Sequence, residues 1–497
     1  MMQICQASCS LPLCWLAAIA APAAAPTANE ASRSLVVFLV IVFAGLPLLF
    51  LWTRFVRPMH LALGFAATAV LWALGYVALM QPGLVAGEAL FGLMLVVLFV
   101  AGWVAGRYGD ADVRPVSVGL VSAIANLLVI GAFLRDDQHG SKLTPVVWTL
   151  GLIGASAALA WLGGLVGRRM RASARLPEAT ALFALVTAIA VFVMIVLGGV
   201  LTGYEAGLAV PDWPNSYGHN MLLYPVSEMK GGVFYEHVHR LYGMLVGATA
   251  AVLVAVVWRD SQVRWLRWLA VSLLCMVCVQ GLLGGLRVTG RATIDIDRSL
   301  LAPSTTIAIV HGVFAQVVFS AALVIAAATS RLFRSDVRPL VAPWASTDRG
   351  VALMLPFAVL VQLIFGALYR HLQPSGGASA PGHPTWAIHA HLTMAVIVTG
   401  LVLLAAGRAW GHAGHPVLRR TGKTIVLLTA LQLVLGVIAV AAVWTRKGSD
   451  IPTFEVAATT VHQGVGAMIL GLSTVLAVWS YRLLADDAPV AATAAAT

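Results

Sequence analysis

Long apolar runs separated by short polar segments make up most of the chain. A helix that crosses the hydrocarbon core of a bilayer needs about 20 apolar residues, because each residue advances the helix by about 1.5 Å. The pattern therefore predicts an all-α polytopic membrane protein. About thirteen membrane-spanning helices are expected, at roughly 35–53, 61–80, 87–106, 115–134, 146–167, 180–201, 234–258, 266–287, 305–328, 350–369, 386–407, 424–444 and 457–480.

The charged residues are few, and their distribution predicts the orientation in the membrane. Only 10% of the 497 residues are charged, and the formal net charge is +11. If the first span runs inward, 20 of the 31 Lys and Arg residues fall in inner loops or at inner helix ends. Since inner loops carry an excess of Lys and Arg, we expect the N-terminus outside and the C-terminus in the cytoplasm of a bacterial plasma membrane. Orientation thus explains the positive charge, and no nucleic-acid partner is expected.

Polar breaks divide the chain into regions. Residues 1–34 include "LPLCWLAAIAAPAAAPTA", which has the short apolar core and small-residue end of a signal peptide. The segment lacks the positive start of such a peptide, so cleavage near Ala25 stays open. Five spans follow at 35–167, with almost no polar residues inside them and no role that the sequence assigns. A basic inner linker at 168–179 precedes the last eight spans, and 485–497 is expected to be a disordered tail.

The last eight spans read as four helices repeated twice. "TIAIVHGVFAQVVF" (306–319) and "ATTVHQGVGAMIL" (458–470) both place a Val-His pair at the outer start of a helix. The preceding helices also correspond, in "VQGLLGGLRV" and "LQLVLGVIAV", and one step earlier "EHVHRL" aligns with "IHAHLT". Because the order is the same in both halves, we predict two related four-helix bundles, at 180–330 and 350–484.

Histidines recur at one depth of these bundles. They lie near the outer ends of the second and fourth helix of each half, as His237/His239, His311, His389/His391 and His462. One such histidine could be an ordinary interfacial residue, but four at corresponding positions indicate a shared chemistry. Neutral imidazole is a common axial ligand of haem iron, whereas zinc and di-iron sites usually recruit cysteines or carboxylates as well. The pattern therefore favours two bis-histidine haem sites, one in each half.

Only one histidine of each His-x-His pair can face the bundle core, because residues two apart point about 200° away from each other around a helix. Glu236 and His239 are three residues apart and share a face, so a carboxylate would stand beside the ligand. This favours His239 and, by the repeat, His391. His237 and His389 are then interpreted as interfacial residues.

Other residues that bind metals in proteins lack partners in this sequence. Cys275 and Cys278 form a CxxC inside an apolar span, where packing is the favoured interpretation. His60 lies at an inner helix end, and His139 lies in the outer loop "RDDQHGSK". No outer loop carries a cysteine pair, so no structural disulfide is expected there; the remaining cysteines are Cys5, Cys9 and Cys14.

Four segments together resemble the haem A synthase family: "GLAVPDWPNSYG" (207–218), "EHVHRL" (236–241), "QGLLGGLRV" (280–288) and "IVHG" (309–312). The resemblance covers about 180–484. Members of that family oxidise the C8 methyl group of haem O to a formyl group and supply haem A to terminal oxidases. The resemblance implies the same membrane oxidoreductase activity, with a role in cytochrome oxidase assembly.

The resemblance also implies roles for the histidines and the glutamate. His239 and His311 would be the axial ligands of the substrate haem, and His391 and His462 those of a haem b cofactor. Glu236 matches the catalytic glutamate of the family, which could accept protons or stabilise a cationic intermediate. Its alternative interpretation is a carboxylate favoured by the helix dipole.

Cationic side chains near the same outer helix ends as the histidines are candidate partners of the haem propionates, which need positive charge nearby. Ordinary interfacial anchoring is the alternative for each. In the first half they are Arg240, Arg287 and Arg291, and in the second half, more weakly, Arg370, Arg446 and Lys447.

The sequence departs from the family pattern at two points. The second half has Ile388 and Leu392 where the first has Glu236 and Arg240, which fits one catalytic half and one cofactor half. The outer-loop cysteine pair of some members is absent, so no redox role for it carries over.

The expected partners are haem O, a haem O synthase, an electron donor, the assembly machinery of a terminal oxidase and the lipid bilayer; the formyl oxygen would come from water or dioxygen. The alternative function is a di-haem b electron carrier linked to quinol. Glu236 and the unequal halves favour the enzyme. All four histidines lie on one side of the membrane, whereas a carrier would have its two haems stacked across it. A transporter or channel is a third reading, against which the scarcity of other intramembrane polar residues argues.

Overall fold

The computed structural model describes residues 47–48, 50–80, 85–136, 144–290, 304–373, 385–411, 415–446 and 450–486. Most of the predicted first span lies outside these residues, as do the segment 1–34 and nearly all of the tail 485–497. Cys5, Cys9 and Cys14 belong to that first segment, and three further residues named above also lie outside the described part: His139, Lys447 and the candidate propionate partner Arg291.

Eleven helices in the described part of the chain are long and apolar enough to cross a membrane. They are α3 (Pro58–Leu79), α4 (Gly87–Tyr108), α6 (Thr144–Arg169), α7 (Ala179–Gly203), α8 (Gly232–Asp260), α9 (Arg264–Thr289), α10 (Thr305–Thr329), α12 (Ala345–His371), α13 (Thr385–Gly411), α14 (Pro416–Thr445) and α15 (Thr453–Leu483). A further helix, α5 (Pro115–Asp136), has a shorter apolar stretch. The all-α polytopic fold is confirmed, whereas the count of thirteen spans stays a prediction.

The helices begin and end where the sequence carries local signals. Proline occupies the first turn of α3 and α14, where its missing N–H costs no helical hydrogen bond. The Ser304 side chain caps α10 by accepting a hydrogen bond from the Ile307 amide at 3.3 Å. Gly290 ends α9 in the left-handed conformation, at φ 65°. These signals fix the depth at which the side chains of each helix lie.

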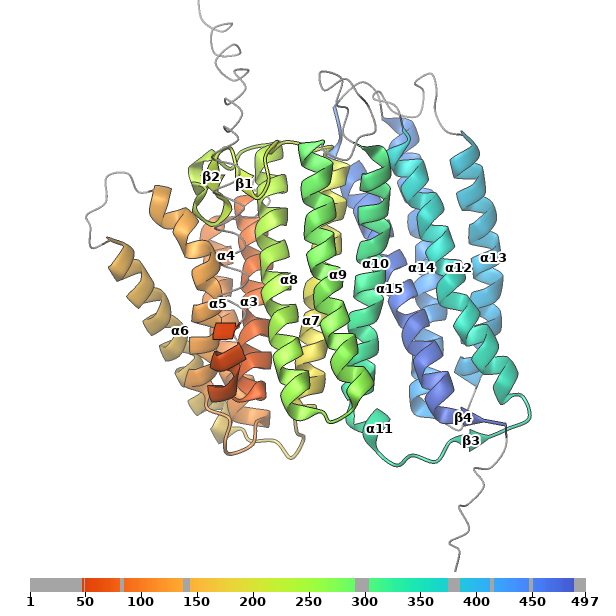
Figure 1. The fold of residues 1–497 in the computed structure, drawn as a ribbon, viewed down its shortest axis with the longest axis horizontal. Helices are drawn as coiled ribbons and strands as arrows, with labels where there is room; N and C mark the ends of the chain where they lie inside the picture. The colour runs from red at the N-terminus through yellow and green to blue at the C-terminus, as the bar shows by residue number, and fades with distance from the viewer. Residues whose placement is uncertain are drawn as a thin grey trace, which may run out of the picture.

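The last eight long helices close into two four-helix groups (Figure 1). In the first, α7 packs on α8 and α10, while α9 fills the fourth corner between α8 and α10. In the second, α12, α13, α14 and α15 contact one another in the same order. The first group meets the second where α7 and α10 pack on α15 and α10 packs on α12. Equivalent helices of the two groups therefore occupy equivalent corners.

Short elements connect these helices. Between α7 and α8 lie an antiparallel pair, β1 (Asn215–Ser216) and β2 (His219–Asn220), and two short helices, η1 (Met221–Leu223) and η2 (Val226–Glu228). At the other end lie α11 (Arg331–Arg334) and a parallel pair, β3 (Leu340–Val341) and β4 (Leu484–Ala485). Figure 1 shows β1 and β2 at one end of the bundles and α11, β3 and β4 at the opposite end.

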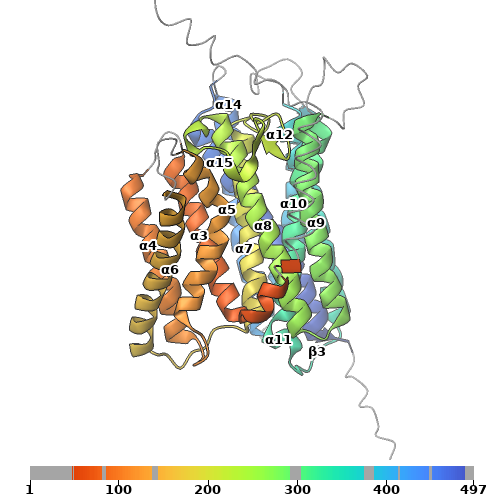
Figure 2. The same ribbon diagram turned by 60° about the vertical axis from the view of Figure 1, so that its left-hand side comes forward.

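Helices α3–α6 form a separate group against the first bundle, with α4 and α6 at its far edge (Figure 2). Glycines let α4 and α6 approach closely, since a Cβ atom on Gly102 would lie 1.9 Å from the Ala160 carbonyl oxygen. Aromatic contacts join α3 to α8: Trp72 meets Tyr242 edge-on at 6.2 Å between ring centroids. The Trp72 indole also donates to Asn126 of α5 at 2.8 Å, which satisfies both groups inside the apolar region.

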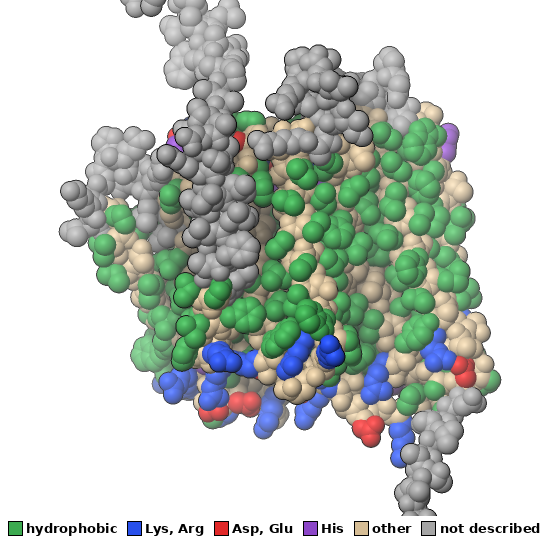
Figure 3. Space-filling model, in the orientation of Figure 1, with side chains coloured by type: hydrophobic (Ala, Val, Ile, Leu, Met, Phe, Trp, Pro, Cys, Tyr) green, Lys and Arg blue, Asp and Glu red, His purple; other side chains and the backbone are tan. Residues whose placement is uncertain are grey.

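Lys and Arg side chains gather at the end that carries α11, β3 and β4 (Figure 3). We call it the basic end, and the opposite end, where β1 and β2 lie, the histidine end. Ion pairs tie the basic end together, among them Arg57–Asp112 at 2.6 Å and Arg408–Asp348 at 2.6 Å. This one-sided distribution agrees with the positive-inside pattern, and which end faces the cytoplasm stays a prediction.

Candidate functional site

The four predicted histidines meet as two pairs. His239 of α8 faces His311 of α10, with 6.5 Å between ring centroids and 64° between ring planes. His391 of α13 faces His462 of α15 with nearly the same geometry, 6.3 Å and 68°. Each pair spans a diagonal of its four-helix group. The two halves of the molecule thus build the same arrangement at the same depth.

The spacing of each pair fits two imidazoles bound to opposite faces of one metal ion. With metal–nitrogen bonds of about 2 Å, the two ring centres would stand roughly 6 Å apart. In the described residues, no group of three or more His, Cys, Asp or Glu side chains could hold a metal ion. A haem supplies four ligands of its own and needs only the axial pair from the protein, so the donor set fits haem.

A glycine on the preceding helix lies against each histidine ring. A Cβ atom at Gly198 would lie 3.3 Å from Cε1 of His239, and one at Gly366 would lie 3.1 Å from Cε1 of His391. Gly284 and Gly436 stand in the same way against His311 and His462, at 3.5 and 3.1 Å. An added Cβ atom would touch the ring at Gly284 and would press on it at the other three glycines. We call these four glycines the ring seats: Gly198, Gly284, Gly366 and Gly436.

Three of the ring seats follow a glutamine by four residues. Gln362 Nε2 lies 3.2 Å from both ring nitrogens of His391, and Gln432 Nε2 lies 3.4 Å from Nε2 of His462. Gln280 donates instead to the backbone carbonyl of His311, at 3.0 Å. The Gln-x-x-x-Gly spacing recurs on α9, α12 and α14 and is visible in the sequence, although our sequence analysis did not use it.

Glu236 and Arg240 form a buried ion pair one turn from His239. Arg240 Nε donates to Glu236 Oε1 at 3.1 Å, and the two side chains are only 8% and 5% exposed. The other carboxylate oxygen, Oε2, is buried without a hydrogen-bond partner in the described residues. A carboxylate with one oxygen held and one oxygen open can accept a proton beside the histidine pair.

Arg240 is held mainly by the segment between α7 and α8. Its Nη1 donates to the carbonyls of Asp212 and Asn215 at 2.6 and 3.0 Å, and its Nη2 donates to the Val210 carbonyl at 2.8 Å. Because all of these contacts are to the protein, the geometry shows Arg240 as an anchor of this segment. A propionate role for Arg240 stays a prediction.

That segment, residues 204–231, folds over the start of α8, and we call it the cover loop. The Asp212 carboxylate accepts hydrogen bonds from the amides of Tyr217 and Gly218, at 2.7 and 2.8 Å. Both residues have positive φ, 49° and 75°, so these bonds hold a conformation that a non-glycine residue rarely adopts. Burial and the nearby Glu228 raise the pKa of the Tyr224 phenol to about 12, so it stays neutral at physiological pH.

His237 lies on α8, but its side chain packs against the cover loop and is not part of the pair between α8 and α10. Its Nδ1 lies 2.9 Å from the Ser216 hydroxyl, and its ring contacts Tyr224 at 4.8 Å between centroids. The side chain is fully buried. Its partner in the repeat, His389, is exposed. The two residues expected to be interfacial therefore differ, because His237 is covered by residues of the cover loop whereas His389 is exposed.

The remaining cationic candidates differ in what they contact. Arg287 is close enough to act electrostatically on Glu236 and His311, and its guanidinium packs against Gly207 of the cover loop. Arg370 donates to the Thr202 carbonyl at the end of α7 at 2.5 Å. Arg446 is paired with Glu455 at 3.3 Å, both side chains being 4% exposed. Among these, Arg287 is the one that lies near Glu236 and His311, and its role as a propionate partner stays a prediction. His371, which sequence reasoning missed, lies near Arg287.

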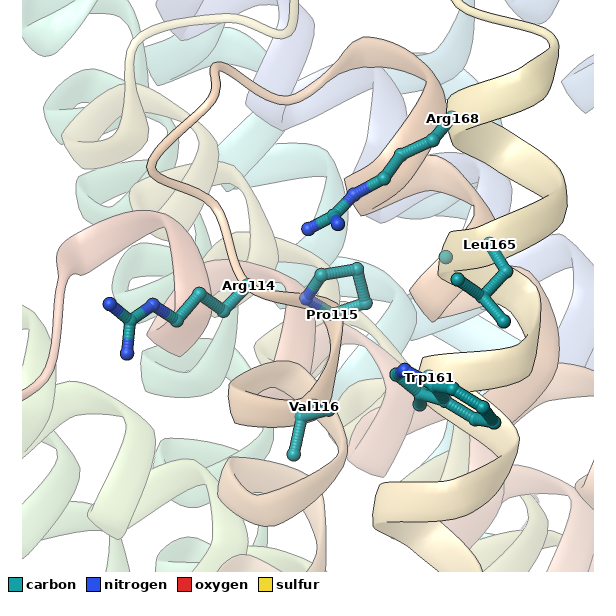
Figure 4. Close-up of a pocket in the computed structure, with 7 residues that line it drawn as sticks. Arg114, Pro115, Val116, Trp161, Leu165 and Arg168 are labelled. Carbon is teal, nitrogen blue, oxygen red and sulfur yellow. The ribbon is translucent and has the colours of Figure 1, made fainter.

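A separate cavity of about 270 Å³ lies at the basic end, between the start of α5 and the last turns of α6. Figure 4 shows Arg168 reaching toward Pro115 above Trp161 and Leu165, with Arg114 extending on the other side. No histidine lines this cavity, and it lies at the opposite end of the molecule from the two pairs. It is not part of the candidate site.

The fold and the histidine pairs define a polytopic membrane protein with two facing histidine pairs, each with a spacing that fits the two axial ligands of a haem. Residues 181–375 match a family model described as cytochrome oxidase assembly protein. The chain is 28% identical to the haem A synthase of Rhodospirillum centenum over 363 residues, covering 63% of this chain and 90% of that protein. It is 26% identical to the haem A synthase of Caulobacter sp. strain K31 over 358 residues, or 61% of this chain and 96% of that protein.

A third relative, the haem A synthase of Beijerinckia indica, is 24% identical over 340 residues, which cover 58% of this chain and 88% of that protein. Over residues 181–375 the chain is thus similar to the cytochrome oxidase assembly family, and its matches to these haem A synthases cover 58–63% of its length. Helices α3–α6 precede the segment that matches the family model.

Proposed function

We propose that this protein is a haem A synthase, a membrane oxidoreductase that converts the C8 methyl group of haem O into the formyl group of haem A. The observation that carries the proposal is the His239–His311 pair, with the open oxygen of Glu236 one turn away. This arrangement lies within the segment that matches the family model. It combines two axial ligands with a proton acceptor, which a site that only transfers electrons does not need.

We assign the substrate haem to the first bundle and a haem b cofactor to the second. Both bundles present a histidine pair, but only in the first does a buried carboxylate lie three residues from a ligand on the same helix; the buried carboxylate of the second, Glu455, precedes His462 by seven residues. The position that aligns with Glu236 is Ile388, which is buried and apolar, and Leu392 aligns with Arg240. The second pair is therefore suited to hold a haem that relays electrons, and the first to hold one that reacts.

The residues around the first pair have separate tasks in this proposal. His239 and His311 bind and orient the substrate, whose iron supplies the oxidising chemistry when it is bound. Glu236 Oε2 accepts the proton that leaves as the methyl group is oxidised, while Arg240 holds Oε1 and balances its charge. The cover loop keeps water away from this carboxylate, and Arg287 faces the propionates.

The proposal also includes the orientation of the enzyme in the membrane and its partners. The histidine end would face the outside of a bacterial plasma membrane, with the basic end in the cytoplasm. Haem O would arrive from a haem O synthase within the bilayer. An electron donor and the assembly machinery of a terminal oxidase would complete the partners.

The test is the haem composition of purified Glu236→Gln protein expressed with a haem O supply. A pyridine haemochrome spectrum and chromatography of the extracted haems should show haem B together with unconverted haem O, with conversion reduced about 10²-fold or more. Glu455→Gln is the matched control, because Glu455 is also a buried carboxylate paired with an arginine at the histidine end. It should still yield haem A. Two molecules of haem B per chain, unchanged by Glu236→Gln, would instead identify a di-haem electron carrier.

A further inference from the structure

The cavity at the basic end is charged on one side and apolar on the other. It lies where α5 begins and α6 ends, and its volume is about 270 Å³. Arg168, Leu165 and Trp161 line it from one face of α6, because residues three, four and seven apart lie above one another on a helix (Figure 4). Trp161 lies about 10 Å deeper along the helix than Arg168, at 1.5 Å per residue. The lining therefore runs from the charged surface of the molecule into its apolar part.

Contacts within the protein hold the walls of this cavity. A Cβ atom on Gly164 would lie 2.3 Å from Cγ of Pro115, so α6 passes very close to the start of α5. The backbone amide of Arg114 donates to Nε2 of the buried His60 at 2.9 Å. The backbone beside the cavity is thus fixed, while the long side chains of Arg114 and Arg168 can adjust to a ligand.

The two arginines that line the cavity have no anionic partner in the part of the chain that the structure describes. The two carboxylates in the turn before α5 pair with other residues, Asp112 with Arg57 at 2.6 Å and Asp110 with Arg175 at 4.0 Å. Neither lining arginine makes a hydrogen bond through its guanidinium group to a described residue. Two positive charges beside one cavity therefore remain for a ligand. Guanidinium groups suit phosphate, because their donors form a planar fork.

The apolar side of the cavity continues into side chains that face the bilayer. Trp161 is 49% exposed and Leu165 is 39% exposed, and Leu162, Val166 and Leu120 beside them are exposed as well. Tryptophan is enriched near the ends of membrane helices, where one part of the ring meets the headgroups and the other the acyl chains. A ligand with a charged head and an apolar body would use both sides of the cavity, whereas a small soluble anion would use only one.

We propose that this cavity binds the headgroup of an acidic glycerophospholipid from the leaflet at the basic end. Arg114 and Arg168 donate to the phosphate, and the acyl chains follow Trp161 and the exposed apolar faces of α5 and α6. Basic pockets between membrane helices recognise acidic lipids in this way. None of the residues that line the cavity is acidic, so the ammonium group of a zwitterionic lipid would find no carboxylate there. The inference does not depend on the proposed function, because the cavity lies at the opposite end from the histidine pairs.

The experiment measures lipid binding to the purified full-length protein in detergent by native mass spectrometry. The protein is titrated with phosphatidylglycerol as the probe and with phosphatidylcholine as the zwitterionic comparison. The wild-type protein should bind one molecule of phosphatidylglycerol more tightly than phosphatidylcholine. Arg114→Gln/Arg168→Gln should weaken this binding about 30-fold, since each arginine near an acidic lipid contributes roughly a fivefold change. Arg168→Gln alone should weaken it about fivefold, and it carries the test if the double variant does not accumulate in the membrane.

Arg419→Gln/Arg420→Gln is the matched control, because it removes two exposed arginines from the start of α14 at the same end of the molecule. It should leave the binding unchanged. Equal binding of the two lipids by the wild-type protein would overturn the inference, as would equal weakening by the two pairs of substitutions.

A second pair of variants tests the apolar side of the cavity. Trp161→Ala should weaken phosphatidylglycerol binding severalfold, whereas Trp148→Ala, which removes a ring that is 56% exposed near the other end of α6, should not. Excess inorganic phosphate distinguishes the two sources of a phosphate group. It should fail to displace the lipid; displacement, or equal effects of the two tryptophan variants, would show that the cavity takes a soluble anion and would overturn the lipid assignment.

Discussion

The two four-helix groups share their scaffold and differ in what surrounds the histidines. Each group places a pair of imidazoles 6.3–6.5 Å apart and seats the rings on glycines. The first places its buried carboxylate three residues from a histidine of the pair, anchors Arg240 in the cover loop, and has Met194 where the other three helices with a ring seat have a glutamine. In the proposed function, the shared parts hold a haem in each group, and the parts found around the first pair make that haem the one that reacts.

The largest effect is expected from replacing a ring-seat glycine by a larger residue, because the ring seats are a feature that both four-helix groups share. Gly284→Val adds two methyl groups to a Cβ atom that would already be in van der Waals contact with Cε1 of His311, at 3.5 Å, so the added atoms should press on the ring. We expect the variant to lose the haem of the first bundle and keep that of the second. Haem per chain, measured on purified protein, should fall to about half if each bundle holds one haem through its axial pair.

Gly281→Val is the matched control for this variant. Gly281 lies on the same helix, and a Cβ atom there would meet no atom within 4 Å. Full haem content in Gly284→Val, or equal loss in both variants, would contradict the ring-seat account.

A smaller effect is expected from loosening the cover loop of the first bundle. Arg240→Lys keeps the charge but cannot reproduce three contacts to the carbonyls of Val210, Asp212 and Asn215. The loss should destabilise the fold by about 2–3 kcal/mol, since the carbonyls lose charge-assisted hydrogen bonds. The midpoint of denaturant unfolding and the rate of proteolysis within 204–231 measure it.

Leu392→Ala is the comparison on the second bundle, at the position that aligns with Arg240. Leu392 is half exposed, so its truncation should change neither quantity appreciably. Equal sensitivity of the two variants would show that the cover loop does not depend on Arg240.

Much of this picture could be predicted from the sequence. Hydropathy places long helices because a bilayer demands runs of apolar residues, and the expected span 180–201 lies within α7 (Ala179–Gly203). The pairing of His239 with His311 followed from their common depth and the repeat. The helical face shared with Glu236 separated His239 from His237.

Other parts could not be predicted in that way. The contacts of Arg240 depend on how the cover loop folds, and hydropathy carries no information about a loop. The ring seats were missed because glycine is common in membrane helices, so single glycines attract no attention. The glutamines were visible, but their meaning required the histidine on the next helix to be placed beside them.

The central claim is that the two histidine pairs hold different haems, and the haem composition of two single-ligand variants tests it most directly. His311→Ala and His391→Ala are purified after expression with a haem O supply, with His389→Ala as a control because that histidine is exposed and lies outside the pairs. The account predicts that His311→Ala keeps haem B and loses haem O and haem A, that His391→Ala loses haem B, and that His389→Ala matches the wild type. Loss of the same haem from both His311→Ala and His391→Ala would contradict it.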